Sequence, residues 1–253
     1  YSMLRKTIES NDSIERYESL GVNVVTGSAT IVSPWQVDIQ TEDGIQSLTT
    51  KNIVIATGAS AFVPPIPGLQ DVDYLTADNL WDLTEQPKRL VVLGGGPIGS
   101  ELSQAFGRLG TQVTQVEMLS QLLAKEDPDA AQHLYDQLIK DGVDVRLNTK
   151  AIAIEKTAED KFIVLEKDGK QEKLPFDEIL IAVGRQANLT GFGLETLGIE
   201  TDRTVVTNEL LQTKYPNILA AGDVAGPYQF THTAAHQAWF AAVNALFRPF
   251  KTF

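Results

Sequence analysis

The chain has 253 residues, 43% of them hydrophobic and 21% charged, which fits a globular protein of one large or two ordinary domains. Its net charge of −12 would repel phosphate polyanions and therefore disfavours nucleic acid as a partner. With no cysteine, the chain can form no disulfide, thiolate metal site or cysteine nucleophile. No apolar run approaches the roughly 18 residues of a membrane span, so we expect a cytoplasmic protein without a membrane segment. Because the sequence opens with Tyr1 in a polar stretch, we also expect a piece of a longer chain.

The beginning of the chain predicts a short helix and then β-structure. Apolar residues at helical spacing predict a helix that ends near Leu20. Three β-prone runs follow at residues 22–25, 29–32 and 35–39, and we interpret them as a three-stranded meander. Residues 73–83 predict a short helix or an irregular stretch before the next strand.

A glycine-rich turn then joins a predicted strand to a predicted helix. The apolar run 90–93 ends at three glycines, and Pro97 stands where a helix can begin, because its fixed φ suits a first helical turn. The spacing Gly94-x-Gly96-x-x-Gly99 fits the dinucleotide fingerprint. In that pattern one glycine makes the turn, one lets the backbone approach a pyrophosphate, and one lets the helix pack on the strand. The amides of the helix N-terminus would hold the phosphate.

The residues after this turn complete a β-α-β order. Apolar residues from Ile98 to Leu109 recur at helical spacing, and Gly110 stands at the C-cap position. Residues 111–117 then form a β-prone run that ends at Glu117, about 20 positions past the glycines, where a carboxylate would meet a ribose 2′-OH. The glycine spacing alone is explained equally well by a turn before a surface helix. The complete order of elements favours a nucleotide site.

The remaining elements repeat these signals. Asp127 caps a predicted helix that ends at Asp141-Gly142. Short strands are predicted at residues 143–147, 152–155, 162–165 and 172–174. Three apolar runs that each end in small residues lie at 53–58, 179–184 and 218–222. The last of them is followed by Asp223, and an alanine-rich stretch at 233–247 predicts a buried helix.

Two histidines raise the question of a metal site. His232 and His236 have the i, i+4 spacing of a metal-binding pair on a helix. The only other histidine is His133, on a different predicted helix, so we interpret the pair as ordinary hydrogen-bonded or solvated histidines. The acidic residues 126–129 indicate a helix start. The sequence predicts neither a metal site nor a catalytic residue.

Taken together and in this order, four motifs resemble those of the pyridine nucleotide-disulphide oxidoreductase family, which includes dihydrolipoamide dehydrogenase, glutathione reductase and mercuric reductase. The motifs are Ile55-Ala56-Thr57-Gly58, Gly94 to Glu101, Ala182-Val183-Gly184-Arg185 with Asn188, and Ala221-Gly222-Asp223-Val224. The resemblance implies a Rossmann-like α/β fold that binds FAD and NAD(P), with an NAD domain inserted in an incomplete FAD domain. The implied domains are the first part of the FAD-binding domain at 1–85, the inserted NAD-binding domain at 86–200 and the return segment of the FAD domain at 201–253.

The resemblance also implies roles for individual residues. FAD would lie along Ala29, Thr57, Gly58 and Asp223, with the Asp223 carboxylate on the ribityl chain. NAD would be lined by Gly94, Gly96, Pro97, Ile98, Gly99, Glu101, Glu117 and Gly184, with Ile98 near the nicotinamide face.

The implied activity is transfer of hydride from NADH to FAD and onward to a disulphide or another acceptor. The family's own FAD glycine motif, its redox cysteine pair and its C-terminal dimerisation domain are not in this sequence. We therefore expect the activity in a longer, homodimeric parent and an inactive 253-residue piece. The alternative is a nucleotide-binding or interaction module without catalysis. A single-Rossmann NAD dehydrogenase ranks last, because the Tyr-x-x-x-Lys pair of the short-chain type is absent.

Overall fold

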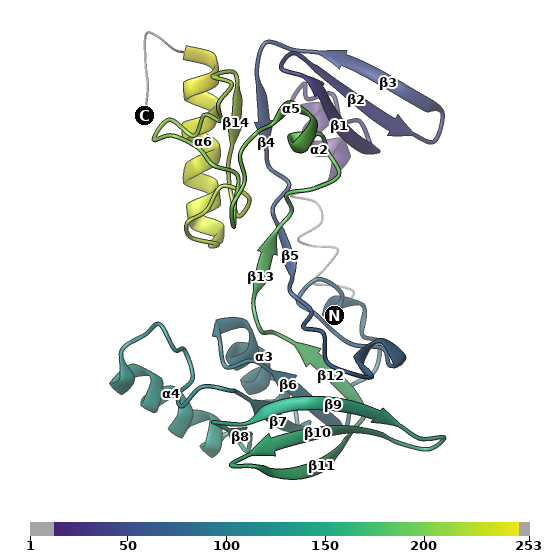
Figure 1. The fold of residues 1–253 in the computed structure, drawn as a ribbon, viewed down its shortest axis with the longest axis vertical. Helices are drawn as coiled ribbons and strands as arrows, with labels where there is room; N and C mark the ends of the chain where they lie inside the picture. The colour runs from purple at the N-terminus through teal and green to yellow at the C-terminus, as the bar shows by residue number, and fades with distance from the viewer. Residues whose placement is uncertain (1–12, 248–253) are drawn as a thin grey trace. The chain divides into compact units, whose positions relative to one another are not determined.

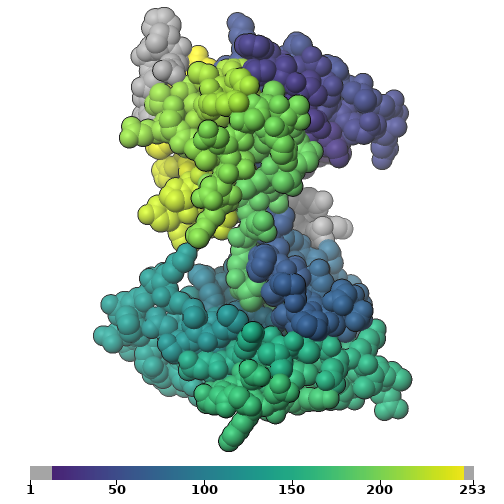
Figure 2. All heavy atoms as spheres, in the orientation of Figure 1, coloured from purple at the N-terminus to yellow at the C-terminus, as the bar shows by residue number. Residues whose placement is uncertain are grey.

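The structure is a computed structural model that describes residues 13–247 (Figure 1). Its residues cluster into two compact units. Among the described residues, one is formed by residues 13–58 and 187–247, and the other by residues 59–186. In Figure 2 the second unit runs from blue through teal to green, and the first unit carries the purple and the yellow-green ends of the scale. The first unit is therefore built from two separate stretches of chain, and the second from one.

These compact units divide the chain at other positions than residues 85 and 200, the edges of the inserted domain that the family resemblance implies. The stretch that precedes residue 85 belongs to the second unit, because the Leu75 amide donates to the Ile179 carbonyl at 2.7 Å and the Leu75 carbonyl accepts from the Ile181 amide at 2.8 Å. The stretch after residue 186 belongs to the first unit, because the Phe192 carbonyl accepts from the Ile31 amide at 2.8 Å. Hydrogen bonds between segments far apart in the sequence therefore determine both limits of the second unit.

The first unit contains an antiparallel meander and a parallel strand pair. Its elements are α2 (Ile14–Ser19), β1 (Ser28–Ser33), β2 (Gln36–Thr41), β3 (Gly44–Thr49), β4 (Ile53–Ile55), α5 (Leu194–Leu197), β14 (Ile218–Ala220) and α6 (Thr231–Phe247). The meander has the order β1-β2-β3, and β4 pairs in parallel with β14. The expected strand at 22–25 is wrong. The third strand is β3 instead, because the turn at Asp43-Gly44 folds it back onto β2. The part of the predicted first helix before residue 13 lies outside the described residues.

The second unit is built on a four-stranded parallel sheet of order β12-β6-β7-β8. The strands and helices of this unit are β5 (Ala59–Ala61), β6 (Arg89–Leu93), α3 (Pro97–Arg108), β7 (Gln112–Val116), α4 (Pro128–Lys140), β8 (Asp144–Arg146), β9 (Lys150–Lys156), β10 (Lys161–Lys167), β11 (Lys170–Phe176) and β12 (Glu178–Ile181), and β13 (Arg185–Ala187) begins in it. Two 3-10 turns, η1 (Leu69–Asp71) and η2 (Leu80–Asp82), precede β6, and η2 lies within residues 73–83, where the sequence allowed a short helix. An antiparallel sheet of order β11-β10-β9 completes the unit (Figure 1).

The parallel sheet separates two hydrophobic cores. Alternate side chains of a strand point to opposite faces, so Leu90 and Val92 of β6 join a core with residues of α3 and α4. Val91 and Leu93 join a second core with residues of β9, β10 and β11. Both faces of the sheet are therefore covered, one by helices and the other by the antiparallel sheet. This explains why the strands read as continuous apolar runs.

Local sequence signals account for several element ends. The Asp127 carboxylate accepts from the Asp129 amide at 2.9 Å and caps α4, which begins at a proline. Asp168 and Gly169, both with positive φ, make the turn between β10 and β11. Among residues 13–247, no helix has both the length and the apolar character that crossing a membrane requires.

Candidate dinucleotide-binding site

The first two glycines of the turn after β6 are held by β7 and by the segment that follows it. The four hydrogen bonds join the Gly94 amide to the Val116 carbonyl (2.9 Å), the Gln115 side-chain amide to the Gly94 carbonyl (3.1 Å), the Gly95 amide to the Glu117 carboxylate (2.6 Å), and the Leu123 amide to the Gly95 carbonyl (2.8 Å). Each backbone polar group of the two glycines thus has a partner. This half of the turn is fixed by the protein itself.

The second half of the turn is open. Helix α3 begins at Pro97 with Gly96 as N-cap, and no side chain caps it. The amides of Gly96, Ile98 and Gly99 donate to no acceptor within the described part of the chain. The first amides of a helix have no partner inside the helix and carry partial positive charge. Three N–H groups are therefore available to an anion at one point of the fold.

The three motif glycines differ in what an added side chain would meet. A Cβ on Gly94, whose φ is +113°, would overlap the carbonyl of Ala182, and a Cβ on Gly99 would overlap the carbonyl of Gly94. A Cβ on Gly96 would meet no atom within 4 Å. Packing therefore requires glycine at Gly94 and Gly99. At Gly96 the protein leaves open space where a side chain would stand.

Glu117 lies directly after β7, next to the turn. Its Oε2 accepts from the Gly95 amide at 2.6 Å, and its Oε1 accepts from the Leu119 amide at 2.8 Å. The carboxylate is half-buried, so part of it faces solvent at the carboxyl end of the sheet. Ligands of open α/β sheets bind at this end of the strands.

The other residues expected on this side of the site lie around the same turn. Pro97 and Ile98 open α3, the first exposed and the second half-buried, and Glu101 is exposed one turn further along the helix. Gly184 follows β12, the neighbour of β6 in the sheet, and its φ is +141°. The amide of Ala182, two residues earlier, donates to the Leu93 carbonyl at 2.8 Å. These residues therefore lie in the first turns of α3 and after the end of the neighbouring strand β12.

Sequence reasoning missed Gln115. This side chain is completely buried, with 0% of its surface exposed, on the face of β7 that packs against α3. Its Nε2 donates to the Gly94 carbonyl at 3.1 Å and to Ser100 Oγ at 3.2 Å. A polar residue at an inward position of a strand, two residues before the acidic position, is the sequence signal that would have identified it.

In the first unit, three expected residues share one end of the β4–β14 pair. Thr57 and Gly58 follow β4, and Asp223 follows β14 and is half-buried. Asn188 holds the β4 end, since its Nδ2 donates to the Thr57 carbonyl at 2.8 Å and its amide to the Gly58 carbonyl at 3.0 Å. Ala29 is exposed on β1, and no hydrogen bond among the described residues joins it to the other three. The structure therefore groups Thr57, Gly58 and Asp223 but not Ala29.

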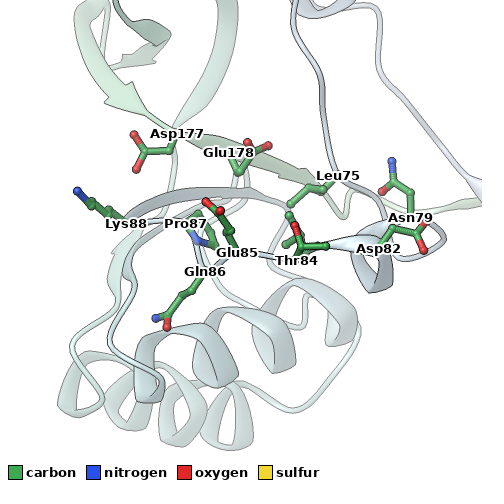
Figure 3. Close-up of a pocket in the computed structure, with 11 residues that line it drawn as sticks. Leu75, Asn79, Asp82, Thr84, Glu85, Gln86, Pro87, Lys88, Asp177 and Glu178 are labelled. Atoms are coloured by element: carbon green, nitrogen blue, oxygen red, sulfur yellow. The ribbon is translucent and has the colours of Figure 1, made fainter. Parts of the chain in front are cut away.

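A cavity of about 760 Å³ lies elsewhere in the second unit. Figure 3 shows its labelled side chains, which come from residues 75–88, before β6, and from the start of β12. Its carboxylates include Asp177, whose pKa burial would raise but which hydrogen bonds from Arg89 hold below its ordinary value. The cavity is at the amino ends of β6 and β12, whereas the glycine turn follows the carboxyl end of β6. We assign it no part in nucleotide binding.

The ends of α3 and α4 are joined by a charged cluster. The Asp141 carboxylate accepts from Arg108 at 2.9 Å, from Gln104 at 2.8 Å and from Gln137 at 3.0 Å. The hydrogen bond from Arg108 holds the pKa of Asp141 below its ordinary value of 3.8, with smaller contributions from the glutamines, although burial acts in the opposite direction. This cluster fixes the helix that carries the open amides.

The two histidines of α6 have aromatic neighbours. The ring of His232 stacks on Phe230 with centroids 5.3 Å apart, and His236 lies 6.3 Å from Phe240. No group of three or more metal-ligating side chains occurs in the portion of the chain that the structure describes.

The parallel sheet, the glycine turn with its helix and the carboxylate after the next strand define the second unit as a Rossmann-like α/β unit. The sequence profile described as "Pyridine nucleotide-disulphide oxidoreductase" matches residues 4–238. The chain therefore belongs to the pyridine nucleotide-disulphide oxidoreductase family.

Two similar proteins and one similar solved structure support this family membership. The chain is 35% identical to a mercuric reductase of Staphylococcus aureus over 92% of its own length and 42% of that protein. It is 38% identical to a dihydrolipoyl dehydrogenase of Acholeplasma laidlawii over 89% of its length and 66% of that protein. The HOCl-induced flavoprotein disulfide reductase RclA from Escherichia coli superposes with a TM-score of 0.87 at 28% identity, covering 99% of this chain and 57% of that one. The chain thus spans less than two thirds of each of these relatives.

Proposed function

We propose that this chain is the nucleotide-binding part of a flavoprotein that takes hydride from NADH. The observation that carries the proposal is the division of the glycine turn into a half fixed by β7 and a half with three open amides. Such amides at the start of a 12-residue helix suit a pyrophosphate. The family membership of the chain supports the same conclusion.

The residues of the second unit fit a dinucleotide in distinct roles. Gly96, Ile98 and Gly99 would bind the pyrophosphate through their amides, and the open space at Gly96 would admit it. Glu117 would accept hydrogen bonds from the ribose hydroxyls. Because residues 118–124 contain no arginine or lysine that could pair with a 2′-phosphate, we propose NADH rather than NADPH as the nucleotide. Pro97, Glu101 and Gly184 would line the same site.

The residues of the first unit would hold one side of the flavin. The ends of β4 and β14 place Gly58 and Asp223 at the same edge, where Gly58 has a positive φ of +65° and no side chain to obstruct a ligand. The Asp223 carboxylate can accept hydrogen bonds from a polyol chain. When bound, the nicotinamide supplies the hydride and the flavin accepts it. We keep the domain proposal of an inserted NAD-binding part at about residues 86–200.

For the whole protein we propose a cytoplasmic homodimer that passes electrons to a disulphide or another acceptor. The names of its relatives, among them mercuric reductase and dihydrolipoyl dehydrogenase, support an acceptor of this kind. Exposed apolar side chains on α6, such as Trp239 at 58% and Leu246 at 71%, support a further protein contact. Light scattering of the full-length protein tests the dimer.

An anaerobic titration tests the central proposal. The full-length protein is purified, and NADH is added while the flavin absorbance is recorded. We expect flavin in the purified protein, and we expect its absorbance to fall with NADH at lower concentrations than with NADPH. Bound flavin that neither nucleotide bleaches would favour a non-catalytic nucleotide-binding module, and protein that holds no flavin would refute the proposal.

A further inference from the structure

The buried side chain of Gln115 is costly unless its polar atoms find partners. Moving an amide from water into an apolar environment without compensation costs free energy, so the two hydrogen bonds of Nε2 matter for this position. The surroundings of the Gln115 side chain are apolar: Val113, on the same face of β7, belongs to the hydrophobic core that β7 forms with α3 and α4. Strands of a parallel sheet that is covered on both faces usually carry hydrophobic residues, so a hydrophobic residue would be expected at position 115. The polar residue that stands here instead makes two hydrogen bonds through Nε2, both at the start of the glycine turn and helix, while its buried Oε1 has no partner among the described residues.

The two hydrogen bonds from β7 act on one peptide group. The carbonyl of Gly94 and the amide of Gly95 belong to the same peptide, and Gln115 donates to the first while Glu117 accepts from the second. Gln115 lies in β7 and Glu117 directly after it, where the Glu117 amide still donates to the Arg146 carbonyl at 2.9 Å, so the chain stays extended and side chains two residues apart point to the same side. Because glycines flank the peptide on both sides, its orientation is less restricted by side chains than that of other peptides. The two side chains restrict it from opposite ends.

Only one of these two side chains can also reach a ligand. Glu117 is half-buried, and under the proposed function it would take up hydrogen bonds from the ribose. Gln115 is fully enclosed, and its two hydrogen bonds go to the Gly94 carbonyl and to Ser100. The fixed direction of the Gly94–Gly95 peptide determines the direction of the chain that follows, including the open amides of Gly96 and Ile98.

We propose that Gln115 is a positioning residue for the dinucleotide: it fixes the Gly94–Gly95 peptide so that the open amides of the turn face the pyrophosphate. This inference rests on the proposed function. The pyrophosphate takes no part in hydride transfer, so the turn should bind it equally well before and during the reaction. Loss of Gln115 should therefore weaken NADH binding and leave the rate of flavin reduction at saturating NADH unchanged.

The chain offers a matched pair of substitutions. Gln115→Met keeps the length and apolar volume of the side chain but cannot donate to the turn. Ser103→Ala is the control. Ser103 is also 0% exposed and lies one turn beyond Ser100 on α3, but its Oγ has no hydrogen-bond partner among the described residues. The control removes a buried hydroxyl from the same helix without touching the turn.

The experiment measures three quantities on the full-length flavoprotein and both variants: the Kd for NADH, the rate of flavin reduction at saturating NADH, and deuterium exchange of a peptide covering residues 93–99. For Gln115→Met we expect a Kd roughly three- to tenfold higher, corresponding to one net hydrogen bond, faster exchange in the turn and an unchanged saturating rate. Ser103→Ala should keep the Kd and the exchange of the parent.

Several results would overturn the inference. A Gln115→Met variant with the parent's Kd and exchange would do so, and so would an equal loss of affinity in both variants, which would indicate packing alone. If Gln115→Met does not fold, Ser100→Ala removes one of the two acceptors of Gln115 and should give a smaller change of the same kind. A parent that binds no NADH would refute the proposed function, and the exchange measurement would still decide whether Gln115 orders the turn.

Discussion

Alanine substitutions at Gly96 and Gly99 separate ligand approach from packing. Gly96 has a φ of −76° and open space where a Cβ would stand, so alanine fits without strain. We expect the free energy of unfolding of Gly96→Ala to stay within about 0.5 kcal/mol of the parent or to rise slightly. At Gly99 the new methyl would overlap the Gly94 carbonyl and lie 3.4 Å from the Ala182 Cβ, so the start of α3 must move. Overpacking of this kind costs about 1–3 kcal/mol, and each kcal/mol lowers the Tm by about 2–4 °C in a chain of this size.

The two variants should differ in another way in their affinity for NADH than in their stability. The methyl of Gly96→Ala would occupy open space at the residue that carries the first of the open amides, and we expect it to hinder the pyrophosphate, so that the affinity for NADH falls at least about tenfold, or about 1.4 kcal/mol. Gly99→Ala should lose affinity together with stability. Calorimetric titration with NADH and thermal unfolding of the two variants measure both effects. Normal NADH binding by Gly96→Ala would reduce the glycine pattern to a structural turn, and an unchanged Tm for Gly99→Ala would refute the contact with Gly94.

Three further predictions concern specificity, pH and flavin. Glu117→Arg should weaken the binding of NADH and shift the relative affinity toward NADPH by about 1–3 kcal/mol, because a charge-assisted contact to the ribose is lost and a 2′-phosphate gains a partner. Calorimetric titration of parent and variant with both nucleotides measures this shift. Equal affinities of the parent for NADH and NADPH would contradict the prediction. The hydrogen bond from Arg108 lowers the pKa of Asp141 below 3.8, so its stabilisation is complete above that pH and is lost as pH falls through the lowered pKa. Urea unfolding should therefore show a gap between parent and Asp141→Asn that narrows in acid, and a gap independent of pH would exclude this cause. The 253-residue chain, which has a single G-x-G-x-x-G, should bind NADH in calorimetry but lose FAD on gel filtration, and flavin retained in stoichiometric amount would contradict this.

The strand, turn and helix around Gly94 could be predicted because their signals are local. Proline at the helix start, glycine after the helix end and an apolar strand on each side are all read from neighbouring residues, and the structure places β6, α3 and β7 there. Gln115 could not be assigned in this way. Its role depends on a carbonyl that comes next to it only when β6 and β7 pair, so the sequence can mark it as a polar residue at an inward strand position but cannot name its partner.

The expected strand that was wrong, and the edges of the two compact units, both depend on distant contacts. Residues 22–25 are β-prone, but the meander uses β3 as its third strand, because a strand requires a partner as well as propensity. The unit edges at residues 58 and 186 follow from the hydrogen bonds of Leu75 and Phe192 to segments far along the chain. No local pattern records such pairings.

The parallel pairing of β4 with β14 has a consequence for the order of folding. Residues 53–55 pair with residues 218–220, and the whole second unit lies between them in the sequence. Closing a loop of that length by diffusion costs on the order of 4 kcal/mol in chain entropy. The second unit removes most of this cost when it folds, because the Phe62 amide donates to the Gly184 carbonyl at 3.0 Å and the Arg185 guanidinium donates to the Ala59 carbonyl, which brings its two chain ends together. The continuous unit should therefore fold first, and the fully buried β14 should join its partner only afterwards.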